Sequence, residues 1–235
     1  MLIDLHAHSG FSKCCKADGE TVLKATKDRG IDGVILTNHY TKIYLTDGIT
    51  PLQLAEQYIR EYYEVKKIGE RLGLKVFFGV EISAEKCNSH LLLYGVEPEF
   101  LLKHAEIYDY ELKDLYELAH KNNAILIQAH PFRWNINSLQ NLDYLDGIEA
   151  NCHMKCEGPH LEEVAKIAKE NNKLLTCGGD FHYDSPRPKC GAYLPEDIND
   201  TKDVIKYLQE QNEFTLCVQV GKGEGDFVDF TFKKN

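Results

Sequence analysis

Short runs of apolar residues alternate along the chain with longer segments in which apolar residues recur every three or four positions. The runs predict strands that are buried on both faces of a sheet, and the periodic segments predict helices that bury one face. Stop and start signals such as Gly30 and Pro51 separate the two kinds of segment. We expect strands at 3–9, 33–39, 75–83, 90–94, 124–130, 147–151, 173–179 and 214–220, helices at 20–29, 51–72, 109–121, 159–171 and 200–211, and then a polar tail.

The expected strands at 75–83 and 90–94 are too close for a parallel connection, which needs about a dozen residues or more. They are therefore predicted to form an antiparallel hairpin. This pairing makes neighbours of Glu81, near the end of one strand, and His90, at the start of the next.

The remaining strands alternate with helices, and this order favours an α/β fold with a parallel sheet. The sheet can be closed as a barrel or open and doubly wound. The 235 residues are enough to bury a large core, and we find no sequence repeat, low-complexity tract or linker. We therefore expect a single domain over residues 1–235.

Net charge and the length of the apolar runs limit which kinds of molecule this protein is expected to bind. The formal net charge of −10 argues against a broad nucleic-acid footprint, because non-specific affinity comes from Lys and Arg that neutralise phosphates. A small phosphorylated substrate held through metal ions stays compatible with this charge. No apolar run approaches 18 residues and the first strand leaves no room for a signal peptide, so we expect a cytoplasmic protein without membrane contact. The oligomeric state stays open.

Eight cysteines lack a C-x-x-C pair and the density of a disulfide scaffold, which favours reduced thiols. The stretch from Cys152 to Cys156, with His153 inside it and His160 nearby, could bind zinc, but its spacing is not a standard one. We interpret these cysteines as ordinary ones. We also expect His104, His120, His153 and His160 to lie at the surface.

Metal-type ligands recur where apolar runs end. His6 and His8 point to the same side of the first strand, because successive side chains on a strand alternate between faces. In a barrel, the carboxyl ends of different strands converge on one mouth. The resulting candidate ligands are His6, His8, Asp18, His39, Glu81, His90, His130, Asp180 and His182.

The alternative is that these groups are satisfied independently in the core. Burying an unpaired polar group costs roughly 2–7 kcal/mol, so the metal interpretation explains the whole set better. For Asp18 alone, an ordinary Asp-Gly turn is a real alternative. Six imidazoles with three carboxylates suit Zn²⁺, Mn²⁺ or Fe²⁺ better than Ca²⁺ or Mg²⁺.

Seven short motifs carry these nine positions: His6-Ala7-His8-Ser9, Ala17-Asp18-Gly19, Thr37-Asn38-His39, Gly79-Val80-Glu81, His90, Ala129-His130-Pro131 and Asp180-Phe181-His182. Together, and in this order, they resemble the PHP (polymerase and histidinol phosphatase) superfamily. The resemblance implies a distorted, seven-stranded (β/α) barrel of the TIM-like, PHP type that holds three divalent metal ions.

The resemblance also implies a distribution of ligands. His6, His8, Glu81 and Asp180 would hold the first metal; Glu81, as a bridge, with His90 and His130 the second; and Asp18, His39 and His182 the third. One position departs from the family pattern, which usually has Thr-Asp-His where this chain has Asn38. This change concerns the tuning of the site rather than its ligands.

Paired metal ions lower the pKa of a bridging water and clamp the oxygens of an in-line displacement, which suits phosphate-ester hydrolysis. We therefore expect a metal-bridging hydroxide to attack a small phosphomonoester, with the third metal on a phosphoryl oxygen or the leaving group. Glu81, Asp180, His182 and Arg133 are the expected catalytic residues. Arg133 is the expected phosphate clamp, because a guanidinium pairs bidentately with phosphate, and a surface arginine is its alternative.

Weaker candidates are Arg187 for substrate binding, Lys189 in the same segment, and Tyr40 or Tyr44 as pocket walls. Three other functions stay open. One is a phosphodiesterase or short-oligonucleotide nuclease of the same family. The second is an amidohydrolase, in which a carbamylated lysine usually bridges the metals where this chain offers a glutamate. The third is a metal-stabilised domain without catalysis.

Overall fold

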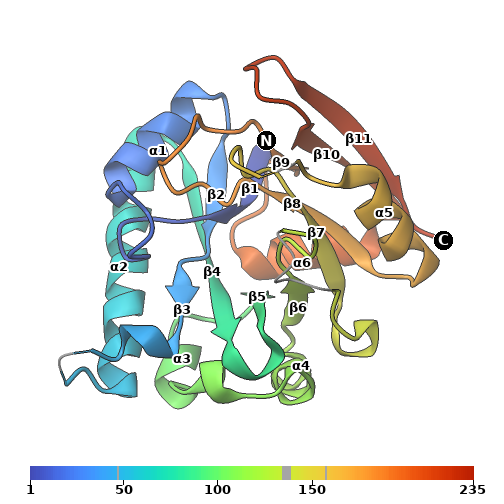
Figure 1. The fold of residues 1–235 in the computed structure, drawn as a ribbon. Helices are drawn as coiled ribbons and strands as arrows, with labels where there is room; N and C mark the ends of the chain where they lie inside the picture. The colour runs from blue at the N-terminus through green and yellow to red at the C-terminus, as the bar shows by residue number, and fades with distance from the viewer. Residues whose placement is uncertain (47, 134–138, 157) are drawn as a thin grey trace.

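The computed structural model describes residues 1–46, 48–133, 139–156 and 158–235. Strands alternate with helices through most of the chain (Figure 1). The strands are β1 (Leu2–Ala7), β2 (Gly33–Leu36), β3 (His39–Tyr40), β4 (Lys75–Ala84), β5 (Ser89–Tyr94), β6 (Ile125–Gln128), β7 (Gly147–Asn151), β8 (Leu174–Gly178), β9 (Gly191–Tyr193), β10 (Glu213–Gln219) and β11 (Phe227–Lys233). The α-helices are α1 (Gly19–Asp28), α2 (Pro51–Leu72), α3 (Phe100–Lys103), α4 (Leu112–Lys121), α5 (Leu161–Glu170) and α6 (Thr201–Glu210), and short 3₁₀ helices are η1 (Lys42–Tyr44), η2 (Glu85–Cys87), η3 (Ile107–Asp109) and η4 (Leu142–Tyr144).

The sheet curls into a barrel. Among the described residues, the row β1-β2-β4-β5-β6-β7-β8 forms its wall, and a parallel bridge between Ala7 and Phe181 brings the two ends of this row together. The backbone N–H of Asp180 also donates to the carbonyl of His6 at 2.8 Å. The barrel class expected from the sequence is therefore confirmed. The strand count differs, because β9, β10 and β11 extend the sheet beyond β1 and β3 pairs with β4 outside this row.

The hairpin predicted around Glu81 is confirmed. Strands β4 and β5 are antiparallel, with Ser83 opposite His90, and β5 is also antiparallel to β6. Glu81 and Ser83 lie on one face of β4 because side chains alternate, so Glu81 is diagonal to His90 across the pair. The parallel pairing of β3 with β4 sets His39 directly opposite Glu81.

Helix α2 matches its predicted bounds because strong local signals set both ends. Thr50 and Gln53 form a capping box before the first turn, and Gly73 ends the helix in the left-handed region with φ 72°. The other predicted helices are shifted by a few residues. The largest shift is before α4, where residues 107–109 form a separate 3₁₀ turn.

The predicted polar tail is wrong. Residues 227–233 form β11, which pairs with β10 along its whole length. Charged and hydroxyl residues interrupt the apolar ones in this strand, and only Phe232 is fully buried, so it lacks the continuous apolar run of an inner strand. Strand β9 was not predicted, because its three residues give too short a pattern.

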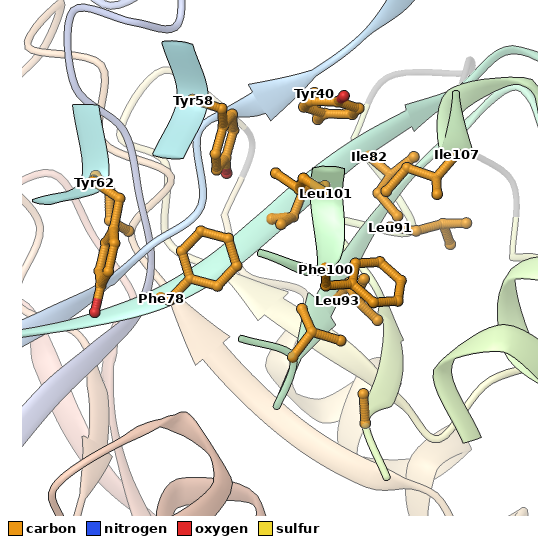
Figure 2. Close-up of a cluster of buried hydrophobic side chains, with 14 of the residues drawn as sticks. Tyr40, Tyr58, Tyr62, Phe78, Ile82, Leu91, Leu93, Phe100, Leu101 and Ile107 are labelled. Atoms are coloured by element: carbon orange, nitrogen blue, oxygen red, sulfur yellow. The ribbon is translucent and has the colours of Figure 1, made fainter. Parts of the chain in front are cut away.

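Buried aromatic rings pack helix α2 against the barrel. Tyr58 and Tyr62 of α2 pack against Phe78 of β4 with ring centroids 6.0 and 5.0 Å apart, and Tyr40 lies beside Tyr58 (Figure 2). The Tyr58 hydroxyl lies 2.8 Å from the carbonyl oxygen of Asn38 and 2.9 Å from that of Gly79. Through this contact α2 supports the ends of the strands that carry His39 and Glu81. Among the described residues, no helix combines the length and the apolar character needed to cross a bilayer.

Candidate metal centre

His6 and His8 face each other at the end of β1, and both are fully buried. Their Nε2 atoms are 3.1 Å apart. His6 Nδ1 lies 2.9 Å from the carboxylate of Glu149, and His8 Nδ1 lies 3.0 Å from the hydroxyl of Ser12. Because these partners accept hydrogen bonds from Nδ1, the neutral form of each imidazole presents its Nε2 lone pair to the other. Two lone pairs at this distance require a proton or a metal cation between them.

The electrostatics of His6 point the same way. Burial disfavours its charged form, but the carboxylates of Glu149, Glu81 and Asp180 raise its pKa well above the ordinary value. The surroundings of this ring therefore favour a positive charge. The pKa of His8 is instead held well below its usual range by burial and by the neighbouring His182, so the surroundings of this ring favour its neutral form, the form that can bind a metal.

Glu81 lies at the centre of the cluster that the candidate metal ligands form, and its side chain has no exposed surface. Burial alone would raise its pKa, but the surrounding histidines hold it well below the usual range, so the side chain is a carboxylate. Its two oxygens face different sets of imidazole nitrogens. Oε2 lies 2.6 Å from His39, 3.3 Å from His8 and 3.4 Å from His6, whereas Oε1 lies 2.9 Å from His90 and 3.1 Å from His130.

Asp180 and His182 approach from the segment that follows β8. Asp180 Oδ1 lies 2.9 Å from His8 Nε2 and 3.5 Å from His6 Nε2. His182 donates from Nδ1 to the carbonyl of Asp180 at 2.8 Å, which leaves its Nε2 as an acceptor. Its ring stacks on that of His8 with centroids 4.1 Å apart.

In the described part of the chain, several buried atoms here make no hydrogen bond, although ion-pair partners lie close to them: His39 Nδ1, Glu81 Oε2 and both carboxylate oxygens of Asp180. Buried polar atoms are normally satisfied, and divalent cations would satisfy these. Three groups have ligand atoms within 4.8 Å of one another: His6, His8, Glu81 and Asp180; His39, Glu81 and His90; and His8, His39 and His182. The donor set therefore fits divalent transition metals.

The first group equals the set predicted for the first metal, and Glu81 occupies the position of a bridge. The structure leaves His130, predicted as a ligand of the second metal, out of the three groups, although its Nε2 lies 3.1 Å from Glu81 Oε1. It also does not bring Asp18 into any of them. Its carboxylate instead accepts a hydrogen bond from the backbone N–H of Thr21 at 2.8 Å and caps α1. A role for Asp18 as a ligand stays a prediction.

The two candidate arginines have different surroundings. Arg133 forms an ion pair with Asp180 and donates to Asn151 at 2.8 Å, so its guanidinium lies at the edge of the cluster. Arg187 is buried and paired with Asp4 at 2.6 Å, a carboxylate that also accepts from the backbone N–H groups of His6 and Gly179. Through Asp4, Arg187 helps to hold the ends of β1 and β8 together. Substrate binding by Arg187 stays a prediction.

The weaker candidates make the following contacts with residues outside the cluster. The Lys189 ammonium lies over the ring of Phe227. Tyr40 and Tyr44 are buried, the hydroxyl of the first bonded to the carbonyl of Ala105 and that of the second to the N–H of Lys13.

The expected surface position is wrong for His153, which follows β7. Its side chain is 10% exposed, and its ring centroid is 5.8 Å from that of His182. Burial lowers the pKa of His153 to about 4. Among the described residues, Cys152 and Cys156 do not belong to the three metal groups, and Cys152 packs against Cys177 with sulfurs 3.5 Å apart.

Glu149 is the functional residue that the sequence analysis missed. It is buried in β7, binds His6 Nδ1, and accepts from the N–H of His130 at 3.0 Å and from Asn151 at 2.9 Å. It therefore orients the ring of His6 and holds the backbone of His130, both of them candidate ligands. A glutamate in the middle of an otherwise buried strand was the available signal.

Two cavities open beside the cluster, and His130 and Arg133 line both. The first measures about 320 Å³, and its wall includes Phe132 and His160, whose rings meet edge to face with centroids 5.8 Å apart. The second measures about 420 Å³. Its wall includes Thr41, Ile43, Ser83, Glu85, Ser89 and His90.

The fold and the site together define an α/β barrel with a histidine and carboxylate metal centre at the carboxyl ends of its strands. Residues 4–177 match the model of the PHP domain family, and the chain belongs to this family. The matched region stops before Asp180 and His182, which the barrel brings to the other ligands.

The chain is also similar to several known proteins. Over 105 residues the chain is 34% identical to phosphoribosyl 1,2-cyclic phosphate 1,2-diphosphodiesterase of Eggerthella lenta, a match to 41% of this chain and 32% of that protein. The chain thus matches about a third of the length of this curated relative. Among solved structures, it resembles a two-domain protein of Bacteroides vulgatus that contains a predicted PHP-like metal-dependent phosphoesterase, with a TM-score of 0.66, 14% identity, and coverage of 100% of this chain and 83% of that one. It also resembles PsfC of Pseudomonas syringae, with a TM-score of 0.64, 17% identity, and coverage of 87% of each chain.

Proposed function

We propose that this protein is a metal-dependent phosphoric ester hydrolase that acts on a small phosphomonoester. The observation that carries this proposal is the position of Glu81, whose two oxygens face separate sets of histidines. A carboxylate in this position can bridge two cations. Membership of the PHP family and the phosphoesterase relatives support the same reaction class.

The chain's own residues would hold up to three divalent ions, Zn²⁺, Mn²⁺ or Fe²⁺, at the three groups described above. When bound, such ions lower the pKa of water and neutralise charge on a phosphoryl group. Glu149 and Ser12 keep the Nε2 atoms of His6 and His8 aimed at the centre. Asp180 completes the first group and also holds Arg133.

Arg133 would position the substrate. Its guanidinium lies beside Asp180 and Asn151, where the cluster meets both cavities, and a guanidinium there can also donate to an anionic phosphoryl group. The alcohol part of the ester would occupy a cavity whose size suits a small molecule. The acidic net charge supports a small phosphorylated substrate over a long nucleic acid.

A phosphodiester is the second candidate, and two observations favour it. The curated relative is a diphosphodiesterase, and the cavities on either side of His130 and Arg133 could take the two ester groups of a diester. An amidohydrolase reaction is less well supported, since Glu81 stands where a bridging lysine would be expected.

The test is metal content together with chelator-sensitive hydrolysis of p-nitrophenyl phosphate and bis-p-nitrophenyl phosphate. Two or three metal ions per chain and cleavage of the monoester would support the proposal, and preference for the diester would favour the second candidate. A protein that cleaves neither ester after metal is restored would contradict both.

A further inference from the structure

A chain of buried hydrogen bonds connects the metal centre to helix α2. It starts at the His8 ring, 3.0 Å from the Ser12 hydroxyl, and continues from Ser12 to the side-chain oxygen of Asn38 at 2.9 Å. Asn38 donates from its amide nitrogen to the Ser9 hydroxyl at 2.8 Å, and Ser9 donates to the carboxylate of Glu61 at 2.6 Å. Ser9, Ser12 and Asn38 are fully buried, and Glu61 is half-buried.

The direction of every hydrogen bond in this chain is determined. Asn38 Oδ1 accepts from the backbone N–H of Ser9 at 2.8 Å, so the amide cannot be flipped. The Ser12 hydroxyl uses its one proton on Asn38, so it accepts from the N–H of His39 at 2.9 Å and from His8 Nδ1. His8 therefore carries its proton on Nδ1 and presents Nε2 to the cluster.

The side chain at position 38 must both accept and donate. Ser9 has one hydroxyl proton, which goes to Glu61, so its oxygen needs a donor on the other side. An amide at position 38 supplies that donor and a carboxylate cannot. Two carboxylates at positions 38 and 61 would compete for a single proton, and one would face the Ser9 oxygen without a hydrogen atom between them.

We propose that Glu61 is a positioning residue of the metal centre, and that it acts on His8 and His39 through Ser9, Asn38 and Ser12. Glu61 and Asn38 form a matched acceptor and donor pair: with Glu61 present, only an amide at position 38 keeps the network satisfied. Glu61 lies on α2 and contributes no ligand to the three metal groups. The proposal rests on metal binding by the cluster, not on the identity of the ester that is hydrolysed.

The proposed pairing predicts that the two single substitutions have different effects on the hydrogen bonds. Glu61→Gln alone leaves every hydrogen bond intact, because the Gln oxygen accepts from Ser9 as the carboxylate does. Asn38→Asp alone leaves Ser9 between two carboxylates. The double variant N38D/E61Q restores the network with the chain reversed, since the Gln amide donates to Ser9 and Ser9 donates to the carboxylate introduced at position 38.

The experiment measures Zn²⁺ affinity by competition with a chromogenic chelator, and thermal unfolding of the metal-free proteins. N38D is expected to bind Zn²⁺ about 10- to 100-fold more weakly, the usual effect of disturbing residues that orient ligands. E61Q and N38D/E61Q should remain within about 3-fold of the wild type, so that the two substitutions are strongly non-additive.

The matched control is Glu64→Gln, which removes the same charge from an exposed position of the same helix. N38D/E64Q should bind Zn²⁺ as weakly as N38D alone. If E64Q restored Zn²⁺ affinity to N38D as well as E61Q does, the effect would come from net charge alone, and the proposed pairing would be overturned. Full affinity in N38D would also overturn it. If N38D does not fold, recovery of the folded protein by E61Q but not by E64Q is the supporting result. A wild-type protein that binds no Zn²⁺ would contradict the proposed function itself, whereas metal binding without ester hydrolysis would leave this pairing standing.

Discussion

Among individual side chains, Glu81 lies within ion-pair distance of five candidate ligand histidines. Substituting it by Gln keeps its size but removes the charge and one ligand oxygen. We expect kcat on p-nitrophenyl phosphate to fall by at least about 100-fold, because losing a metal-bound carboxylate removes several kcal/mol of transition-state stabilisation. Metal content should fall with it. Glu210→Gln, at the exposed end of α6, is the control, and full activity of E81Q with normal metal content would exclude the bridge.

Arg133 and Arg187 are both paired with aspartates, but they should respond differently to substitution by Lys. Lys cannot reproduce the planar fork of Arg133, so R133K should lower kcat/KM by about 10-fold or more with metal content retained. R187K should lower the melting temperature, because it disturbs the partner of the fully buried Asp4, and should leave KM unchanged. Steady-state kinetics and thermal unfolding of both variants separate the roles. A raised KM in R187K with unchanged stability would restore the substrate role predicted from the sequence.

At the scale of strands, the distance between β8 and β1 determines how far apart the candidate ligands at their ends lie. A Cβ at Gly178 would lie 2.3 Å from His6 Cβ and 2.7 Å from the Glu149 carboxylate. Gly178→Ala should therefore push the two strands apart and cost about 1–3 kcal/mol of unfolding free energy, with weaker metal binding. Gly225→Ala is the control, since its Cβ would meet nothing within 4 Å. Chemical denaturation and metal titration check both effects, and unchanged affinity in G178A would show that this contact does not position His6.

The strands and helices that the sequence predicted well are those with strong local signals. The 147–151 strand and the 51–72 helix have their predicted bounds, the helix because a capping box and a left-handed glycine mark its ends. The β4–β5 hairpin followed from the length of its connection alone. Strand β9 was missed because its three residues give too short a pattern, and β11 because it lacks a continuous apolar run.

For the chain taken together, the sequence predicted which residue types gather at the strand ends, but not which atoms face one another. The proposed roles of Glu149 and Asn38 depend on contacts between segments far apart in the chain. A glutamate within a predicted strand is visible in the sequence, but the atoms that it contacts are not. Asp18 shows the opposite case: the Asp-Gly turn was recognised as its alternative, and in the structure its carboxylate caps the following helix.

The cluster also determines how the folded chain should respond to metal removal. Without metal ions, the barrel must keep the Glu81 and Asp180 carboxylates and several imidazoles buried and close together, with some of their atoms lacking hydrogen-bond partners. A metal that binds only the folded state adds about 2.7 kcal/mol per site when its free concentration is 100 times its Kd. We therefore expect chelation to lower the melting temperature and Zn²⁺ or Mn²⁺ to restore it, with a shift that grows with metal concentration. Calorimetry on the wild type and on E81Q checks this. Stabilisation of similar size in the variant would mean that the metal binds elsewhere on the chain.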